Sequence, residues 1–337
     1  MKAVHSNDAR AFWVVAPGRG EIRPTPLPSA AADDVTVRSL FSGVSRGSES
    51  IVFTGRVPES ERQRMRGPFQ DGEFPGPVKY GYSSVGVVED GPDGLRGRRV
   101  FVLHPHQTRF VVPANAVFVL PDDVPSERAI LAANLETAIN GLWDATPRIG
   151  DRIAIIGAGV VGCLAAWLAG RIPGCAVRLI DIAGDRARIA SALGVAFTSA
   201  DVVPDDHDLV IHTSGTASGL RLALSAAAQD ATIVDLSWYG DQDVCLPLGQ
   251  SFHPRRLSVK SSQVGRVPSS QAPRWDTRRR MAMAISLLSN QVLDVLISGE
   301  NDFEDLPTVM PRLASSAGVA LCHRIRYSTP TGVSRHV

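Results

Sequence analysis

The stretch that most constrains this fold is an apolar run that ends in closely spaced glycines, residues 152–162. The run 152–156 predicts a buried strand, and residues 163–169 continue as a helix. In a G-x-G-x-x-G turn, the first glycine permits the bend, the second lets the backbone approach a pyrophosphate and the third allows close helix packing. The N–H groups at the start of the helix then face the anion. We therefore predict a phosphate-binding turn formed by Gly157, Gly159, Val160, Val161 and Gly162.

A carboxylate at the end of the next apolar run narrows the choice of dinucleotide. Residues 177–180 predict a second strand, and Asp181 follows it, nineteen residues after Gly162. An acid at this place accepts hydrogen bonds from the adenosine ribose and repels a 2′-phosphate. NAD(H) is therefore the expected cofactor, with NADP(H) as the alternative. The alternative is a glycine-rich turn that binds no nucleotide. Such a turn would not need a strand before it, a helix after it and an acid at the end of the next strand.

Composition places the chain among ordinary soluble proteins. Its 337 residues give room for two domains, and 44% apolar residues with a net charge of +1 do not indicate nucleic-acid or membrane partners. The first residues lack a signal-peptide pattern and no apolar run has the roughly 18 residues of a membrane span, so a cytoplasmic location is expected. The cysteines show neither CxxC spacing nor clustering, which argues against disulfides and a thiolate zinc site; they are Cys163, Cys175, Cys245 and Cys322.

The pattern of apolar runs and turn signals changes near residue 126. Short β-branched runs separated by turn signals between residues 10 and 130 predict a compact antiparallel β domain, a partly open barrel. Residues 56–74 interrupt it with a charged stretch that we expect to be a surface excursion with helical character. Residues 126–144 then predict a pair of helices.

Six predicted strands alternate with helical segments in the second half, which indicates a parallel sheet with helices on both faces. They are residues 152–156, 177–180, 196–198, 209–211, 232–236 and 257–260. Six strands suit a complete dinucleotide-binding domain, expected over residues 131–290. A short helix near 305–314 and a last strand at 320–327 have no place in a closed six-stranded set. The tail, residues 291–337, is therefore expected to return to the first domain, residues 1–130.

This organisation resembles the medium-chain dehydrogenase/reductase superfamily, whose members are alcohol dehydrogenase-like, over nearly the whole chain. The resemblance implies an α/β protein with a GroES-like β-barrel domain and a Rossmann domain, a doubly wound parallel six-stranded sheet. It also implies an NAD(P)-dependent enzyme, a site between the two domains, and a homodimer. The segments that carry it are 11–15, 26–28, 42–46, 81–88 and the glycine turn. Residues 45–49, 78–82, 104–107 and 237–240 look more specifically like the branch that contains bacteriochlorophyllide a dehydrogenase and uncharacterised bacterial relatives.

The matched positions depart from the zinc-dependent members of that superfamily. Those enzymes hold a catalytic zinc with residues that match Ser45, Tyr82 and a position near Ala133. Serine, tyrosine and alanine cannot reproduce a tight nitrogen and sulfur zinc site. The four-cysteine structural zinc lobe is missing as well, since no cysteine precedes Cys163. The resemblance therefore implies a zinc-independent member, with no zinc expected.

Without a metal, hydrogen-bond donors or a cation must stabilise the oxygen charge that develops during hydride transfer. Tyr82 occupies the position of the lost histidine, and Lys79 three residues earlier would depress the pKa of its phenol. The alternatives are a core tyrosine and a solvated surface lysine. His106, or its neighbour His104, is a candidate proton relay, although an HxH pair can also bind a metal or be structural.

Further candidates are hydroxyl groups and cofactor contacts. Ser45 and Ser48 are possible hydroxyl relays, although serines in turns often cap their own backbone. The resemblance implies that Arg46 contacts the cofactor pyrophosphate. It also places Thr137 against the nicotinamide, whereas a helical threonine can bond back to its own turn. The sequence does not decide whether Glu136 is buried or exposed. Two more cofactor contacts are expected where predicted strands end: Ser214 and, beside Tyr239, Trp238.

These observations indicate an oxidoreductase that transfers a hydride between NAD(H) and a secondary alcohol or ketone of a small metabolite or specialised-pathway intermediate. The first alternative is a reductase of a conjugated C=C bond, an enone or an imine, which needs no alkoxide stabiliser. The second is a non-catalytic nucleotide-binding sensor or scaffold. The partner expected in each catalytic case is a small-molecule substrate, with neither nucleic acid nor membrane.

Overall fold

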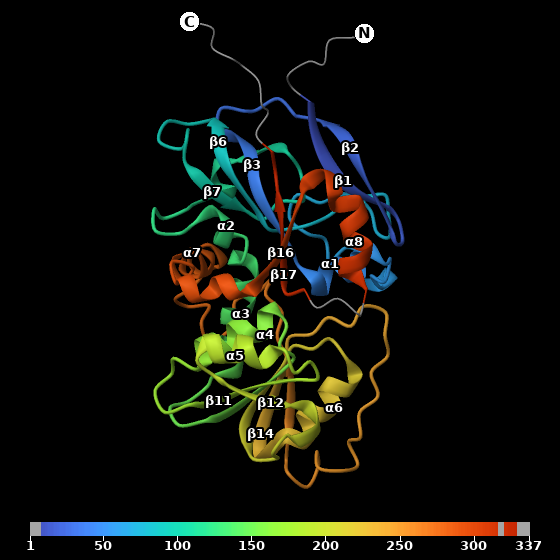
Figure 1. The fold of residues 1–337 in the computed structure, drawn as a ribbon, viewed down its shortest axis with the longest axis vertical. Coiled ribbons are helices and arrows are strands. Elements are labelled where there is room, and N and C mark those ends of the chain that lie inside the picture. The colour runs from blue at the N-terminus through green and yellow to red at the C-terminus, as the bar shows by residue number, and fades with distance from the viewer. Residues whose placement is uncertain (1–7, 316–319, 329–337) are drawn as a thin grey trace, which may run out of the picture. The chain divides into compact units, whose positions relative to one another are not determined.

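The computed structural model describes residues 8–315 and 320–328. The chain divides into two compact units (Figure 1). One unit contains the chain up to Ile130 and again from Ser298, and the other spans Leu131–Ile297. Among the helices in the described residues, none is long and apolar enough to cross a membrane.

The second unit is built on a six-stranded parallel sheet, which confirms the predicted α/β fold. Its strands are β10 (Arg152–Ile156), β11 (Ala176–Asp181), β12 (Ala196–Ser199), β13 (His207–His212), β14 (Ala227–Asp235) and β15 (Ser258–Ser261). Their order in the sheet is β12-β11-β10-β13-β14-β15. The chain thus moves outward from β10 in one direction and then, from β13, in the other. This reversal is the topological switch point at which doubly wound sheets bind ligands.

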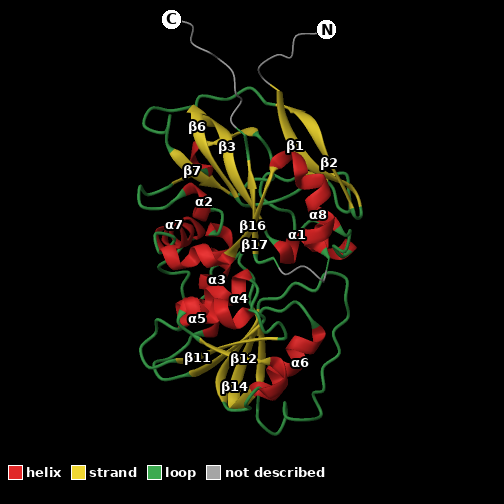
Figure 2. Ribbon diagram, in the orientation of Figure 1, coloured by secondary structure: helices red, strands yellow, loops and turns green. Residues whose placement is uncertain are grey.

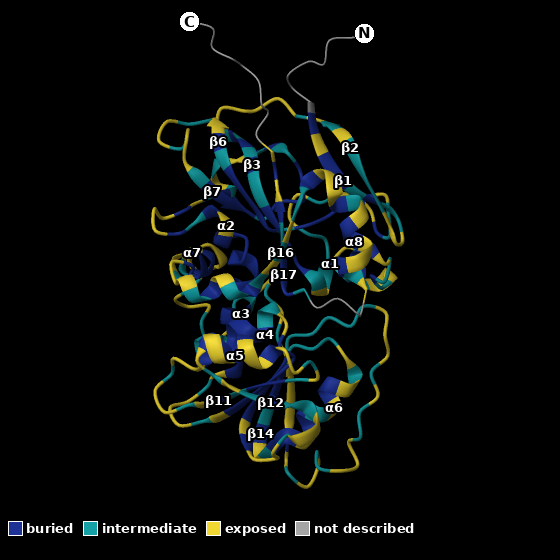
Figure 3. Cartoon of the chain, in the orientation of Figure 1, coloured by how far each residue is buried: buried dark blue, intermediate teal, exposed yellow. Residues whose placement is uncertain are grey.

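Helices of the second unit cover both faces of this sheet. They are α3 (Ala132–Ala145), α4 (Val160–Ala169), α5 (Arg186–Leu193), α6 (Ala217–Ala226) and α7 (Thr277–Leu287), with 3-10 turns η3 (Ala200–Val202) and η4 (Gln291–Leu296). Because parallel crossovers are right-handed, α4 and α5 lie on one face and α6 lies on the other. The central strands are dark blue in Figure 3, and Ile153, Ile155 and Leu179 are fully buried. η4 packs on α5, so this unit extends to Ile297.

The first unit is mainly β structure and has the GroES-like fold (Figure 2). A four-stranded sheet has the order β2-β1-β5-β4, and a larger sheet has the order β16-β17-β3-β6-β7-β9, with β8 also paired to β3. The strands are β1 (Asp8–Ala16), β2 (Arg19–Pro26), β3 (Asp34–Val44), β4 (Asp71–Gly72), β5 (Val78–Lys79), β6 (Ser84–Asp90), β7 (Arg99–Val102), β8 (Arg109–Pro113), β9 (Phe118–Val119), β16 (Ile297–Asp302) and β17 (Cys322–Arg326). Alternating residues such as Val35, Val37 and Val100 fill the core.

Helices in the first unit are short: α1 (Arg46–Phe53), α2 (Ser126–Ala129) and α8 (Leu306–Ala314), with 3-10 turns η1 (Glu59–Glu61), η2 (Ala114–Ala116) and η5 (Phe303–Asp305). β17 pairs antiparallel with β3, and α8 packs on α1 and β2, so the described part of the tail from Ser298 onward joins this unit, whereas residues 291–297 belong to the second unit. The expected helical character of residues 56–74 is wrong beyond the single turn η1. Pro58, Gly67 and Pro68 explain this, because proline and glycine are poor helix formers.

Candidate active site

The glycine turn after β10 is shaped by close contacts. Gly157 has a φ of +104°, and a Cβ on it would lie 2.7 Å from the backbone of Ser214. A Cβ on Gly162 would lie 1.9 Å from the carbonyl oxygen of Gly157. A Cβ on Gly159, the N-cap of α4, would meet nothing within 4 Å. The first and third glycines are therefore required by packing, while the second leaves open space beside the start of α4.

Asp181 is fixed beside this turn. Its Oδ2 accepts a hydrogen bond from the backbone N–H of Ala158 at 2.6 Å, and its Oδ1 accepts one from Ala183 at 2.9 Å. The carboxylate is half-buried at the end of β11. An acceptor held next to the predicted phosphate-binding turn has the chemistry that ribose recognition requires.

Ser214 and Trp238 follow the ends of β13 and β14, as the sequence predicts, and both are half-buried. The Ser214 hydroxyl lies 2.6 Å from Nε2 of His212. Nδ1 of the same imidazole lies 2.9 Å from Oδ1 of Asp235. Sequence reasoning missed His212 and Asp235. Their signal was available, since each follows a short apolar run at the end of its strand, residues 209–211 in β13 and 233–234 in β14.

Three other candidates have definite contacts. The hydroxyl of Thr137 donates to the carbonyl of Ala133 at 2.9 Å, which is the structural alternative considered for it. Glu136 is buried, and Nε of Arg280 donates to it at 3.0 Å. Burial raises the pKa of Glu136, and the charge of Arg280 opposes this shift. In the first unit, Nη2 of Arg46 donates to the carbonyl of Ser315 at 3.2 Å.

A buried polar cluster occupies the first unit around α1. Nε2 of His106 lies 2.8 Å from Oε2 of Glu49, whose other oxygen accepts from the backbone N–H of Ser45 at 2.7 Å. Nδ1 of His106 lies 2.7 Å from the hydroxyl of Ser42, and that hydroxyl lies 2.9 Å from the hydroxyl of Tyr327. All five side chains are buried. Sequence reasoning identified His106 and Ser45 but missed Glu49, Ser42 and Tyr327.

Tyr82 borders this cluster. Its phenol oxygen is hydrogen-bonded by the hydroxyls of Ser45 and Ser48, and its side chain is half-buried. Burial, together with the negative charge of Glu49, raises the pKa of Tyr82 to about 12. The phenol is therefore protonated at neutral pH and is a hydrogen-bond donor rather than a base.

The ammonium group of Lys79 does not have the predicted effect on the Tyr82 phenol. Its ammonium group donates to Oε1 of Gln107 at 3.0 Å and lies 3.9 Å from the carboxylate of Asp71. Burial lowers the pKa of Lys79, and Asp71 opposes this shift. The expectation that Lys79 depresses the pKa of Tyr82 is wrong, because that pKa is raised by burial and by Glu49.

The two histidines of the HxH pair have different surroundings. The ring of His104 stacks on Phe110 with centroids 3.8 Å apart, and Phe69 stacks on it at 5.6 Å. Its Nδ1 lies 2.9 Å from the carbonyl of Pro105. Burial lowers the pKa of His104 to about 3, so this ring is neutral at physiological pH. Of the pair, only His106 belongs to the polar cluster.

The residues present do not fit a zinc site. Within residues 8–315 and 320–328, no three His, Cys, Asp or Glu side chains gather where they could hold a metal ion. His106 and Glu49 bind each other, and Ser45 and Tyr82 offer only hydroxyl oxygens. A tetrahedral zinc site is normally built from thiolates, imidazoles and carboxylates.

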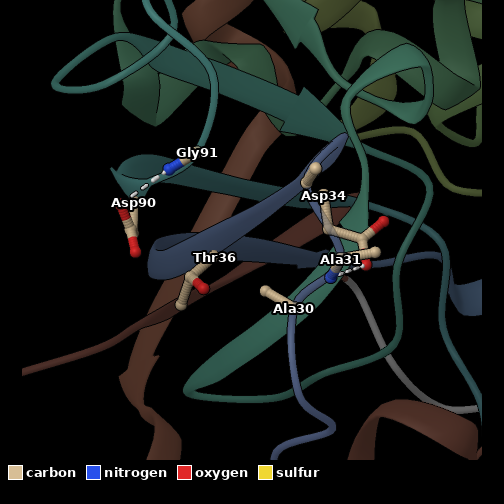
Figure 4. A pocket seen from close by; sticks show the side chains of 7 residues that line it. Ala30, Ala31, Asp34, Thr36, Asp90 and Gly91 are labelled. Carbon is tan, nitrogen blue, oxygen red and sulfur yellow. Dashed lines mark hydrogen bonds between the residues drawn. The ribbon is translucent and has the colours of Figure 1, made fainter.

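A pocket of about 230 Å³ lies elsewhere in the first unit, between the start of β3 and the end of β6 (Figure 4). Asp34 and Asp90 line it, and their carboxylates accept hydrogen bonds from the backbone N–H groups of Ala31 and Gly91. It shares no residue with the buried cluster around Glu49. This pocket therefore has no part in the candidate site.

Sequence comparison with known proteins finds dehydrogenases. No family model matches the chain. D-guloside 3-dehydrogenase of Escherichia coli (strain K12) is 24% identical over 292 residues, which cover 78% of this chain and 83% of the relative. The 2-desacetyl-2-hydroxyethyl bacteriochlorophyllide A dehydrogenase of Cereibacter sphaeroides is 30% identical over 167 residues, 42% of this chain and 46% of the relative.

Solved structures share the fold. A zinc-binding dehydrogenase of Sinorhizobium meliloti 1021 bound to NADP has a TM-score of 0.76 at 17% identity and covers 95% of this chain and 100% of its own. An alcohol dehydrogenase of E. coli CFT073 with NADH has a TM-score of 0.73 at 18% identity and covers 96% of this chain and 100% of its own. At these identities the likeness shows the fold alone. The dehydrogenases related in sequence support the medium-chain dehydrogenase/reductase superfamily.

Proposed function

We propose that this chain is a zinc-independent oxidoreductase that interconverts a secondary alcohol and a ketone of a small metabolite with NAD(H). The observation that carries the proposal is Tyr82, a protonated phenol bonded to Ser45 and Ser48, at a position that zinc-dependent members give to a metal ligand. A phenol can replace a metal as the group that stabilises negative charge on oxygen. That the sequence relatives are dehydrogenases supports hydride transfer as the reaction class.

The proposed cofactor is NAD(H). When bound, a nicotinamide supplies the hydride chemistry, and the chain only has to orient the reactants and manage one proton. Solved neighbours hold NADP in one case and NADH in another, so the fold is compatible with either. The fixed carboxylate of Asp181 favours NADH, because it would repel a 2′-phosphate and can accept from ribose hydroxyls.

Tyr82 is the proposed catalytic donor. As a ketone is reduced, its O–H donates to the carbonyl oxygen and then gives its proton to the alkoxide, while the O–H groups of Ser45 and Ser48 stabilise the phenolate. Glu49 has two roles in this arrangement. Its negative charge adds to the effect of burial in raising the pKa of the Tyr82 phenol, and its bond to the Ser45 N–H fixes the start of α1.

His106 is a proposed positioning residue for Glu49. Its ring is held from both sides, by Ser42 at Nδ1 and by Glu49 at Nε2. The imidazole therefore orients the carboxylate, 2.8 Å from its Nε2. Lys79 is proposed to contribute to catalysis only indirectly, because its ammonium contacts Gln107 rather than Tyr82.

Isotope transfer tests this reaction class. The purified, metal-free protein is incubated with deuterated NADH and a panel of ketones, enones and imines, and the position of the label is determined. Label on a carbinol carbon supports the proposal, and label on a β-carbon or an amine carbon would replace it with the rival reductase. NADH binding without turnover on the whole panel would replace it with a nucleotide-binding sensor. Tyr82→Phe should lower turnover by about 100-fold and leave NADH affinity unchanged.

A further inference from the structure

A buried histidine connects the two turns that follow β13 and β14. His212 is the last residue of β13, and its ring is fully buried. Its Nε2 contacts the Ser214 hydroxyl at 2.6 Å, and its Nδ1 contacts Asp235 at 2.9 Å. The hydroxyl of Ser214 also lies 2.9 Å from that of Thr216, at the start of α6. One imidazole therefore sets the position of the turn after β13.

Asp235 does the same for the turn after β14, of which it is the last strand residue. Its Oδ1 accepts from the backbone N–H of Ser237 at 2.9 Å, and its Oδ2 accepts from the hydroxyl of Tyr239 at 2.8 Å. The two turns also meet directly, since the N–H of Gly215 donates to the Ser237 hydroxyl at 3.1 Å. His212 and Asp235 thus hold both turns in one hydrogen-bonded unit.

The place of this unit in the fold indicates what it serves. The hydroxyl of Thr213, next to His212, donates to the carbonyl of Gly157 at 2.8 Å, so the unit adjoins the phosphate-binding turn. In a doubly wound sheet, each half takes one mononucleotide. The half containing β10, β11 and Asp181 takes the adenosine. The half containing β13 and β14 therefore takes the nicotinamide mononucleotide.

We propose that His212 and Asp235 are positioning residues for the nicotinamide half of the cofactor. They fix the Ser214 hydroxyl and the turn that carries Trp238 at the edge where this half of the dinucleotide lies. The inference rests on the proposed nicotinamide-dependent function, and it assigns a role to residues outside the glycine turn. It predicts that these residues affect the binding of NADH without affecting the binding of its adenosine half.

His212 and Asp235 together decide what Ser214 offers a ligand. Oδ1 of Asp235 accepts from Nδ1 of His212, so Nε2 accepts the hydrogen of the Ser214 hydroxyl. The Ser214 oxygen is thereby left as a hydrogen-bond acceptor.

The test compares NADH with ADP as probes on the full chain. Asp235→Asn keeps the shape of the carboxylate and removes its charge, and His212→Gln removes the imidazole. Each should raise the Kd for NADH by about tenfold and leave the Kd for ADP within about twofold. His207→Gln is the matched control, because His207 is also buried on β13 but lies at its opposite end. This control should change neither affinity.

Ser214→Ala provides a milder variant that leaves the His212–Asp235 pair intact, should His212→Gln fail to fold. It should weaken NADH binding but not ADP binding. Equal weakening of NADH and ADP, or no change in either, would overturn the inference while the wild-type chain still binds NADH. Failure of the wild-type chain to bind NADH would overturn the proposed function itself.

Discussion

The imidazole of His106 and the carboxylate of Glu49 form a buried pair, with 2.8 Å between Nε2 and Oε2 and exposed fractions of 1% and 4%. Neither group reaches solvent, and each makes a second hydrogen bond, His106 to Ser42 and Glu49 to the N–H of Ser45. The pair thus links the strand that ends near Ser42 to the start of α1, from which Ser45 and Ser48 reach Tyr82.

Glu49→Gln should lower turnover by about tenfold or more and leave NADH affinity unchanged, because it removes the charged acceptor of the hydrogen bonds from Ser45 and His106 that hold the start of α1 beside Tyr82. The pKa of Tyr82 should fall below about 12 in this variant, since the charge of Glu49 raises it. Steady-state kinetics and the ultraviolet absorbance of tyrosinate measure the two effects. Glu21→Gln, on the half-exposed strand β2, is the control. Normal turnover in the Glu49 variant would remove the cluster from the mechanism.

His104 should make the protein sensitive to acid. Its pKa is about 3 in the folded state and 6.5 as its ordinary value, so the unfolded chain binds more protons between these values. Above pH 6.5 the titration of His104 does not change the free energy of unfolding. As pH falls from 6.5 toward 3, protonation of His104 in the unfolded chain lowers that free energy by about 1.4 kcal/mol per pH unit. Urea unfolding across this range should show a shallower decline for His104→Asn than for the wild type. Parallel declines would contradict this account.

The buried ammonium group of Lys79 should lower the free energy of unfolding at neutral pH. Its folded-state pKa lies below 10.5, so the unfolded chain binds more protons as pH approaches that value, and the wild type gains stability as pH rises through this window. Lys79→Met should therefore be neutral or stabilising by about 1 kcal/mol near pH 7, with an advantage that shrinks toward pH 10.5. Denaturant titrations at several pH values test the trend. A large loss of turnover in this variant would restore Lys79 as a catalytic candidate.

Two glycine substitutions separate packing from binding. Gly162→Ala places a Cβ 1.9 Å from a backbone oxygen, so it should destabilise the second unit by about 2 kcal/mol or more. Gly159→Ala meets nothing within 4 Å and should fold normally, yet it should weaken NADH binding by about tenfold because the methyl group occupies the approach of the pyrophosphate. Thermal unfolding and NADH titration distinguish the two. Unchanged NADH affinity in Gly159→Ala would argue against this turn as the pyrophosphate site.

Local patterns were sufficient to predict the Rossmann sheet. The glycines and Asp181 are close in sequence. Each strand contains an apolar run that can be recognised in the sequence, so all six strands lie near their expected positions. The same logic placed Ser214 and Trp238 beyond the ends of strands, because parallel strands present their carboxyl ends at one edge.

Contacts between distant residues could not be predicted in this way. Glu49 and His106 are 57 positions apart, and Glu136 and Arg280 are 144 positions apart, so only the fold brings them together. Lys79 and Tyr82 show the converse. They are neighbours in sequence, but the ammonium of Lys79 bonds to Gln107, so proximity along the chain gave the wrong electrostatic partner.

The most direct test of the central claim is a fluorescence titration of purified, metal-analysed protein with NADH and NADPH, alongside Asp181→Ala. The account predicts no stoichiometric zinc and NADH binding at least about tenfold tighter than NADPH binding, because a carboxylate beside a 2′-phosphate is repulsive. Asp181→Ala should remove most of that preference while the chain stays folded. One zinc per chain, or equal affinity for the two nucleotides, would contradict the account.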